Sequence, residues 1–220
     1  MASATLDSLA LLDAVAATLA QATGEVQLPL HILLENHFGD LNENQEEMLQ
    51  AANAAADRID LASRQLRRIL DIEHGRITFQ REAVRPGDLL QPVMAIAAAR
   101  GEPRDVEITI DRSPVLPSVV ADRYFLGEAL TALFTAVVDW AMPATALAVE
   151  VVETGSCVRI DLRYTGATPY GLEAVVATRL IQAQRGEVTF AAGRVTVMLP
   201  ADIPSGMPPA RGARTESAGD

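Results

Sequence analysis

The chain has 220 residues, a net charge of −11, and 49% hydrophobic but only 4% aromatic residues. The negative charge disfavours a nucleic-acid surface or an anionic membrane surface as the partner. The single cysteine excludes an internal disulfide, and no Cys/His cluster has the spacing of metal ligands.

The composition also bears on location and domain organisation. The apolar run 9–22 is too short to span a membrane, contains Asp13, and follows a start without basic residues. We therefore expect a cytoplasmic protein. The length suits a helical hairpin followed by an α/β domain of about 125 residues.

The first two expected elements are long helices. The first runs from Leu6 to Phe38. The second follows a capping box formed by Asn42 and Gln45 and ends at about His74. Both carry apolar residues every seven positions: Leu12, Leu19, Val26 and Leu33 in the first, and Ala52, Ile59 and Leu66 in the second. Heptads on two consecutive helices indicate an antiparallel hairpin whose seam can pair with a second copy.

Two residues weaken the middle of the first helix. Gly24 costs roughly 1 kcal/mol relative to alanine in a helix interior. Pro29 removes one backbone donor and clashes with the preceding turn, which predicts a bend near Glu25.

After Gly75 the pattern changes to short strands and amphipathic helices. Strands are expected at 77–82, 106–111, 147–153, 158–163, 187–190 and 194–199, and helices at 89–100, 123–140 and 171–184. Turn residues at 154–156 and 191–193 indicate two β-hairpins. The expected domains are therefore a hairpin at 1–75 and an α/β domain at 76–202. The Pro-, Gly- and Ser-rich residues 203–220 are expected to form a disordered tail.

The stretch Thr23-Gly24-Glu25-Val26-Gln27-Leu28-Pro29-Leu30 resembles the phosphoacceptor segment of sensor histidine kinases, in which His-Glu precedes Pro-Leu by about five residues. The order of elements over residues 20–200 is similar to the cytoplasmic core of that family. The resemblance implies an α+β fold, with a dimerising antiparallel helical hairpin (a four-helix bundle in the dimer) followed by a histidine-kinase-type α/β sandwich. Gly24 occupies the histidine position and cannot accept a phosphoryl group.

Further positions that the resemblance assigns to a nucleotide site have also lost their chemistry. Ala132 and Ala136 stand where asparagines of the family would hold Mg²⁺ and phosphates. Tyr164 replaces the carboxylate of an Asp-x-Gly turn that ends at Gly166.

The segment that begins at Gly171 resembles the Gly-Leu-Gly-Leu phosphate loop, but Glu173 replaces its second glycine. A carboxylate there has the wrong charge for binding phosphates. The interval between Gly166 and Gly171 is also too short for a mobile lid. We therefore expect neither kinase activity nor a cofactor.

Three hypotheses remain, and the first is preferred. The chain is a dimeric adaptor that binds the receiver domain of a response regulator or a partner kinase. Alternatively, it is a histidine phosphotransferase in which His31, one heptad after Gly24, accepts the phosphoryl group, although an ordinary surface histidine is the competing interpretation. The third hypothesis is an active kinase.

The predicted partner contacts are Thr23, Gln27, Leu30, His31 and Leu34, with Arg64 or Arg68 from the second helix. His37 and His74 are expected near helix ends, and whether the dimer is homomeric stays open.

Overall fold

The computed structural model of the chain describes residues 2–35 and 39–202, which form two units. The first unit contains the residues up to Thr78 together with Tyr170–Ala183. The second unit contains Phe79–Pro169 and continues from Gln184. His37 and the predicted tail at 203–220 lie outside the described residues, and the division into domains at 75/76 stays a prediction.

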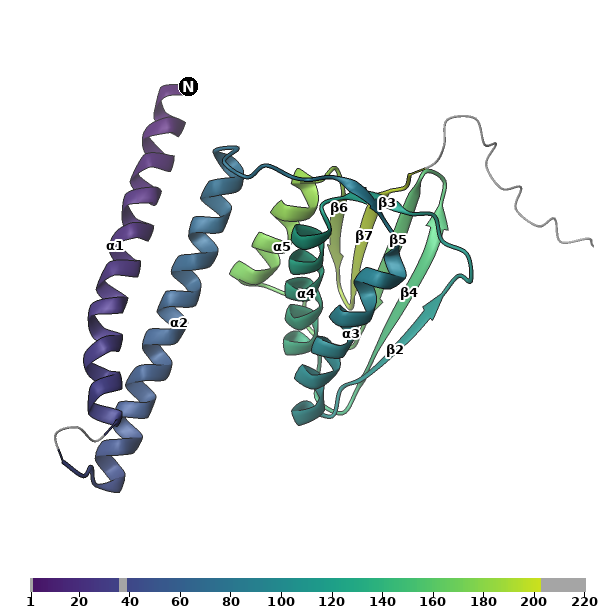
Figure 1. Cartoon of the computed structure of the whole chain (residues 1–220). Coiled ribbons are helices and arrows are strands. Elements are labelled where there is room, and N and C mark those ends of the chain that lie inside the picture. The colour runs from purple at the N-terminus through teal and green to yellow at the C-terminus, as the bar shows by residue number, and fades with distance from the viewer. Residues whose placement is uncertain (1, 36–38, 203–220) are drawn as a thin grey trace, which may run out of the picture. The chain divides into compact units, whose positions relative to one another are not determined.

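Two helices, α1 (Ala2–Leu34) and α2 (Glu43–Glu73), form the expected antiparallel hairpin (Figure 1). Helix α1 is one uninterrupted helix that contains both Gly24 and Pro29. It ends at Leu34, earlier than the predicted end at Phe38, and residues 36–38 lie outside the described residues.

The predicted ends of α2 are confirmed. The Asn42 side chain accepts from the amide of Gln45, and the Gln45 side chain accepts from the amide of Asn42, each at 3.0 Å. This reciprocal pair satisfies amides that a helix N-terminus otherwise leaves unpaired. At the other end, Gly75 adopts the left-handed conformation with φ +65°, and the amide of Arg76 donates to the carbonyl of Asp71.

Small residues hold α1 and α2 together. Ala16 and Thr23 on α1, and Ala56 and Ser63 on α2, are buried and lie seven residues apart on each helix. The Ser63 hydroxyl donates to the carbonyl of Ala16 at 2.9 Å, a contact that requires the two backbones to lie close together. The heptad residues Leu12, Leu19, Val26 and Leu33 remain exposed in the single chain.

A charged cluster joins the N-terminal half of α1 to the end of α2. The carboxylate of Asp13 lies 2.9 Å from Nε2 of His74 and also pairs with Arg76, which in turn pairs with Asp71. The hydrogen bond and charge of Arg76 outweigh desolvation and lower the pKa of Asp13. His74 thus lies just after α2, as expected for a residue near a helix end.

The second unit is built around a five-stranded sheet with strand order β2-β4-β5-β7-β6. Its strands are β2 (Glu107–Arg112), β4 (Ala146–Thr154), β5 (Cys157–Arg163), β6 (Glu187–Ala191) and β7 (Arg194–Pro200). Strands β2 and β4 are parallel, and every other neighbouring pair in this sheet is antiparallel. The two predicted β-hairpins, β4–β5 and β6–β7, are confirmed.

Helices α3 (Pro86–Gly101) and α4 (Arg123–Trp140) lie side by side along one face of this sheet (Figure 1). Strands β1 (Glu82–Val84) and β3 (Val119–Ala121) form a separate antiparallel pair, and a 3₁₀ turn spans Glu102–Arg104. The strand predicted at 77–82 is wrong for all but its last residue. Residues 77–81 form no ladder, because pairing with β3 begins only at Glu82.

The alternation along the central strands divides the sheet into an apolar and a polar face. Strands β4, β5 and β7 bury Leu147, Val149, Val151, Val158, Ile160, Leu162, Val195, Val197 and Leu199. The opposite face carries a charged network centred on Asp161 of β5, whose side chain is fully buried. Arg194 donates to both of its oxygens, at 3.1 and 2.6 Å, and Thr196 and Arg159 also contact it. Such complete pairing is what allows a carboxylate to be buried.

Candidate functional site

Gly24 lies on the exposed surface of α1. A Cβ placed on Gly24 meets no atom within 4 Å, so the surroundings leave space for a side chain. The position that the resemblance equates with the phosphoacceptor histidine is therefore accessible but carries no nucleophile.

His31 lies seven residues further along α1, which is nearly two full turns and therefore the same side of the helix. Its side chain is 70% exposed, and its Nε2 lies 3.0 Å from Oε1 of Glu35. An exposed imidazole beside a carboxylate is a chemically reasonable phosphoryl acceptor, because the carboxylate can orient the ring and hold its proton. The sequence did not indicate Glu35 as the partner of His31.

The other predicted contact residues of α1 differ in accessibility. Thr23 is only 6% exposed and its hydroxyl donates to the carbonyl of Leu19, so its side chain is not part of the exposed surface of α1. Gln27 donates to Asp57 of α2 at 2.8 Å. Leu30 and Leu34 are half-buried and present part of their side chains to solvent.

The predicted arginines of α2 do not lie at the level of His31. Gln27 and Asp57 mark one level of the antiparallel hairpin. His31 lies four residues beyond Gln27 on α1. Because the helices are antiparallel, Arg64, seven residues beyond Asp57 on α2, is displaced in the opposite direction. At 1.5 Å per residue the two are separated by roughly 16 Å along the hairpin. A partner that contacts both must therefore have an interface at least this long. Arg64 itself pairs with Asp60 at 2.6 Å.

In the second unit, the positions that resemble a metal-phosphate site are apolar. Ala132 of α4 is half-buried and Ala136 is buried, and neither has a side-chain oxygen or nitrogen. The hydroxyl of Thr135, which directly precedes Ala136, donates to the carbonyls of Thr131 and Ala132 within α4. These positions of α4 offer no ligand to Mg²⁺.

The turn that resembles Asp-x-Gly packs against the C-terminal end of α4. Tyr164 is 7% exposed, and its hydroxyl donates to the carbonyl of Ala167 at 3.0 Å. Burial raises the pKa of the Tyr164 hydroxyl, which keeps it neutral. Gly166 pairs with Ala141, and a Cβ on Gly166 would lie 2.3 Å from the carbonyl oxygen of Trp140. Gly166 is therefore required by the close approach of two backbones, independently of any nucleotide.

The residues of the segment that resembles a phosphate loop lie in the first unit, at the start of α5 (Leu172–Ala183). Gly171 has φ +144°, a conformation that side chains rarely adopt. The Glu173 carboxylate accepts a hydrogen bond from Nε2 of Gln65 at 3.0 Å. The carboxylate that we expected to repel phosphates thus has a partner on α2.

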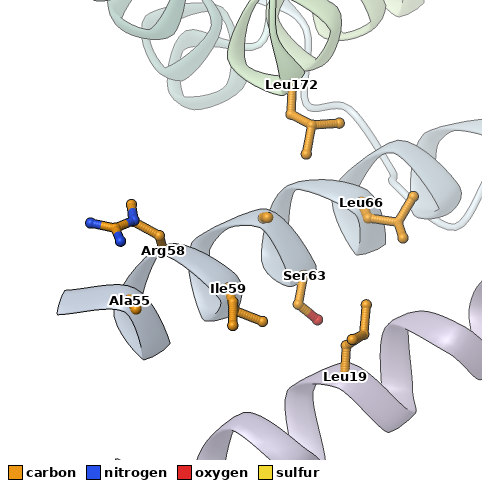
Figure 2. A pocket seen from close by; sticks show the side chains of 8 residues that line it. Leu19, Ala55, Arg58, Ile59, Ser63, Leu66 and Leu172 are labelled. Atoms are coloured by element: carbon orange, nitrogen blue, oxygen red, sulfur yellow. The ribbon is translucent and has the colours of Figure 1, made fainter. Parts of the chain in front are cut away.

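An apolar pocket of about 490 Å³ lies next to this contact within the first unit. Figure 2 shows Leu19 of α1 and Leu172 of α5 on opposite sides of α2, whose Ile59, Ser63 and Leu66 lie between them. The sequence indicated Leu19, Ile59 and Leu66 through their heptad spacing. No local pattern indicated Leu172 or the hydrogen bond between Gln65 and Glu173, because these contacts join segments about a hundred residues apart.

The described part of the chain offers neither a metal site nor a membrane-spanning helix. Among residues 2–35 and 39–202, no group of three or more His, Cys, Asp or Glu side chains is arranged to hold a metal ion. Within the same ranges, no helix combines the length and the apolar character needed to cross a bilayer.

The fold of the chain is similar to the folds of several solved structures. The histidine kinase AdeS of Acinetobacter baumannii matches 83% of this chain and 97% of its own, with a TM-score of 0.63 and 13% identity. Full-length ShkA, solved in complex with AMPPNP, matches 84% of this chain with a TM-score of 0.64 and 20% identity. The chain has a histidine-kinase-like fold. It spans less than half of ShkA, at 45% of that chain.

The predicted fold class, a helical hairpin followed by a histidine-kinase-type α/β sandwich, is thereby confirmed. No protein-family model and no curated protein sequence matches the chain.

Proposed function

We propose that this protein is a catalytically degenerate, histidine-kinase-like component of two-component signalling. It acts as a dimeric adaptor that binds the receiver domain of a response regulator or a partner kinase. One observation carries the proposal: the fold is that of a histidine kinase core, while the positions of its chemistry carry Gly24, Ala132, Ala136 and Tyr164.

The absence of kinase chemistry follows from the side chains present. Phosphoryl transfer requires a nucleophile, a bound metal and donors to the phosphates. Gly24 has no side chain, the two alanines have no ligand atoms, and the buried Tyr164 is held by Ala167. Gly24 removes the nucleophile and the two alanines remove metal ligands, so restoring only one of these groups would not restore the reaction.

Dimerisation is supported by the exposed apolar stripe of the hairpin. Leu12, Leu19, Val26 and Leu33 of α1 and Ile59 of α2 are exposed in the single chain, and the 490 Å³ pocket lies between Leu19 and Ile59. A contiguous apolar surface of this kind marks an interface, and heptad spacing favours packing against other helices. A second copy supplies the two helices that complete a four-helix bundle.

The docking surface is proposed to comprise Gln27, Leu30, His31 and Leu34 of α1. This surface combines half-buried apolar side chains with an exposed imidazole. Arg64 and Arg68 extend the surface along α2 and carry positive charge that suits the acidic pocket of a receiver domain.

The adaptor hypothesis is tested by binding. A panel of purified receiver domains is passed over the full-length protein, and the affinity of each is measured against a Leu34→Asp variant. We expect at least one receiver to bind, and Leu34→Asp to weaken binding about tenfold or more by placing a charge in an apolar contact. Leu61→Asp, an exposed substitution outside the proposed surface, serves as the control. Equal binding by both variants would contradict the docking surface.

The His31–Glu35 pair supports a second candidate function, histidine phosphotransfer. In that reaction Nδ1 of His31, the ring nitrogen that does not face Glu35, attacks the aspartyl phosphate of a receiver. The N–P bond forms as the acyl O–P bond breaks, the aspartate leaves as a carboxylate, and Glu35 holds the imidazole proton.

Labelled phosphoryl transfer distinguishes the two functions. Phosphorylated receivers are mixed with wild type and with His31→Ala. Acid-labile label on the wild type that disappears in the variant would establish the phosphotransferase. Receiver binding without label establishes the adaptor. Label acquired directly from ATP would instead establish an active kinase.

A further inference from the structure

Helix α5 makes three contacts with α2 that neither the sequence pattern nor the proposed function explains. Leu172 lies on the pocket formed with Ile59 and Leu66, and is 37% exposed. Glu173 accepts a hydrogen bond from Gln65 at 3.0 Å.

The third contact lies further along both helices. Nε of Arg179 lies 3.3 Å from Oε1 of Glu73. From Glu173 to Arg179 the rise along α5 is about 9 Å, and from Gln65 to Glu73 the rise along α2 is about 12 Å. The two helices therefore run in the same direction over this stretch, with one polar contact near each end.

The two polar contacts use residues of α2 outside the series that faces α1. The α1-facing residues are Ala56, Ser63 and Leu70, at intervals of seven. Gln65 and Glu73 lie eight residues apart, and neither belongs to that series. Helix α2 can therefore contact α1 and α5 at the same time.

We propose that Leu172, Glu173 and Arg179 form an intramolecular latch, which holds α5 on the C-terminal half of α2 and restricts access to it. Gln65 lies directly between Arg64 and Leu66 and one turn before Arg68. A partner that uses the arginines must therefore displace the latch or bind beside it. This regulatory role rests on the proposed docking function, whereas the latch contacts themselves do not.

The latch combines contacts that are individually weak in water. The Arg179–Glu73 pair is half-exposed, and such pairs contribute little to stability. Leu172 buries only part of its side chain. A contact of this strength can open and close without unfolding of α2, which is the requirement for a regulatory device.

Cleavage by chymotrypsin tests the latch without any partner. Tyr170 is 82% exposed and immediately precedes the latch, so cleavage after Tyr170 reports local opening of this segment. The full-length protein is digested under native conditions, and the fragment that ends at Tyr170 is followed by mass.

We expect Arg179→Glu to increase the cleavage rate about fivefold or more, because the new carboxylate would face that of Glu73 and repel it. The charge-swapped double variant Glu73→Arg/Arg179→Glu should return to within about twofold of wild type. Arg123→Glu, the same charge change at an exposed position of α4, should leave the rate unchanged. A rate unaffected by Arg179→Glu, or a double variant as fast as the single one, would overturn the latch.

Affinity for the receiver panel tests the regulatory role. Arg179→Glu should bind the selected receiver at least about threefold more tightly than wild type, and the charge-swapped variant should not. Faster cleavage with unchanged affinity would overturn the regulatory role. If no receiver binds either protein, the receiver-binding form of the proposed function and the regulatory role both fail, while the cleavage result still decides whether the latch exists.

Discussion

Gly24 is one of the residues at which the chain departs from the kinase pattern, and its effect on stability can be predicted from its surroundings. Replacing it with alanine adds a Cβ that meets no atom within 4 Å, so packing neither gains nor loses. Gly24 is helical and its φ is not positive, so alanine adopts the same backbone without strain. The remaining effect is helix propensity, about 1 kcal/mol in favour of alanine at an exposed interior position.

For a chain of this length, a gain of about 1 kcal/mol raises the melting temperature by about 2–4 °C. Thermal unfolding followed by circular dichroism at about 222 nm measures it, with a urea titration to confirm that the slope of the transition is unchanged. A melting temperature equal to or below that of wild type would refute the reasoning, because it would show that Gly24 supports a contact or a bend that alanine cannot accommodate.

Gly166→Ala is the matched control, since the same chemical change should have the opposite sign. The added Cβ would lie 2.3 Å from the carbonyl oxygen of Trp140, so the two backbone segments must separate. We expect a loss of about 2 kcal/mol or more, as for other overpacked sites. If Gly24→Ala stabilises the protein but weakens receiver binding, the glycine is retained for docking.

Three further predictions concern charge, nucleotide and assembly. Burial raises the pKa of Asp161, but hydrogen bonds from Arg194 and Thr196 and nearby positive charge lower it by more. Its contribution to stability is therefore present above the unfolded value near 3.8 and lost as the pH falls through the folded pKa. Asp161→Asn should destabilise the protein by about 3 kcal/mol at neutral pH and flatten the acid limb of a stability–pH profile, and an unchanged limb would contradict this. MgATP should leave the melting temperature unchanged, whereas a site saturated about a hundredfold above its Kd would stabilise the fold by about 2.7 kcal/mol. Leu19→Asp should shift the protein from dimer to monomer in sedimentation velocity while Leu61→Asp should not, and two equal profiles would exclude the proposed seam.

The hairpin was well predicted because its signals are local. The capping box of Asn42 and Gln45, the glycine stop at Gly75 and the heptads each depend on residues within a few turns. The β-hairpins were also predictable, since Gly155 and Gly193 adopt the positive φ that tight turns require. The prediction of a strand at 77–82 was wrong because a strand needs a hydrogen-bonded partner. The pairing with β3 includes Glu82 but none of the residues before it.

The candidate site was only partly predictable for the same reason. The missing nucleophile at Gly24 and the missing ligands at Ala132 and Ala136 are properties of the residues themselves. The burial of Thr23 and the pairing of His31 with Glu35 depend on how the helix is packed and on which rotamers are free.

The sequence by itself determined that Gly24, Ala132 and Ala136 carry neither a nucleophile nor a metal ligand, because a side chain that is absent cannot be supplied by folding. It also determined the helical hairpin and most of the sheet, through short-range patterns of apolar and turn residues. Only the tertiary structure decided that Gly166 is needed for backbone packing and that Glu173 pairs with Gln65. Contacts between distant segments depend on the closure of the whole chain, and no local pattern of residues encodes them.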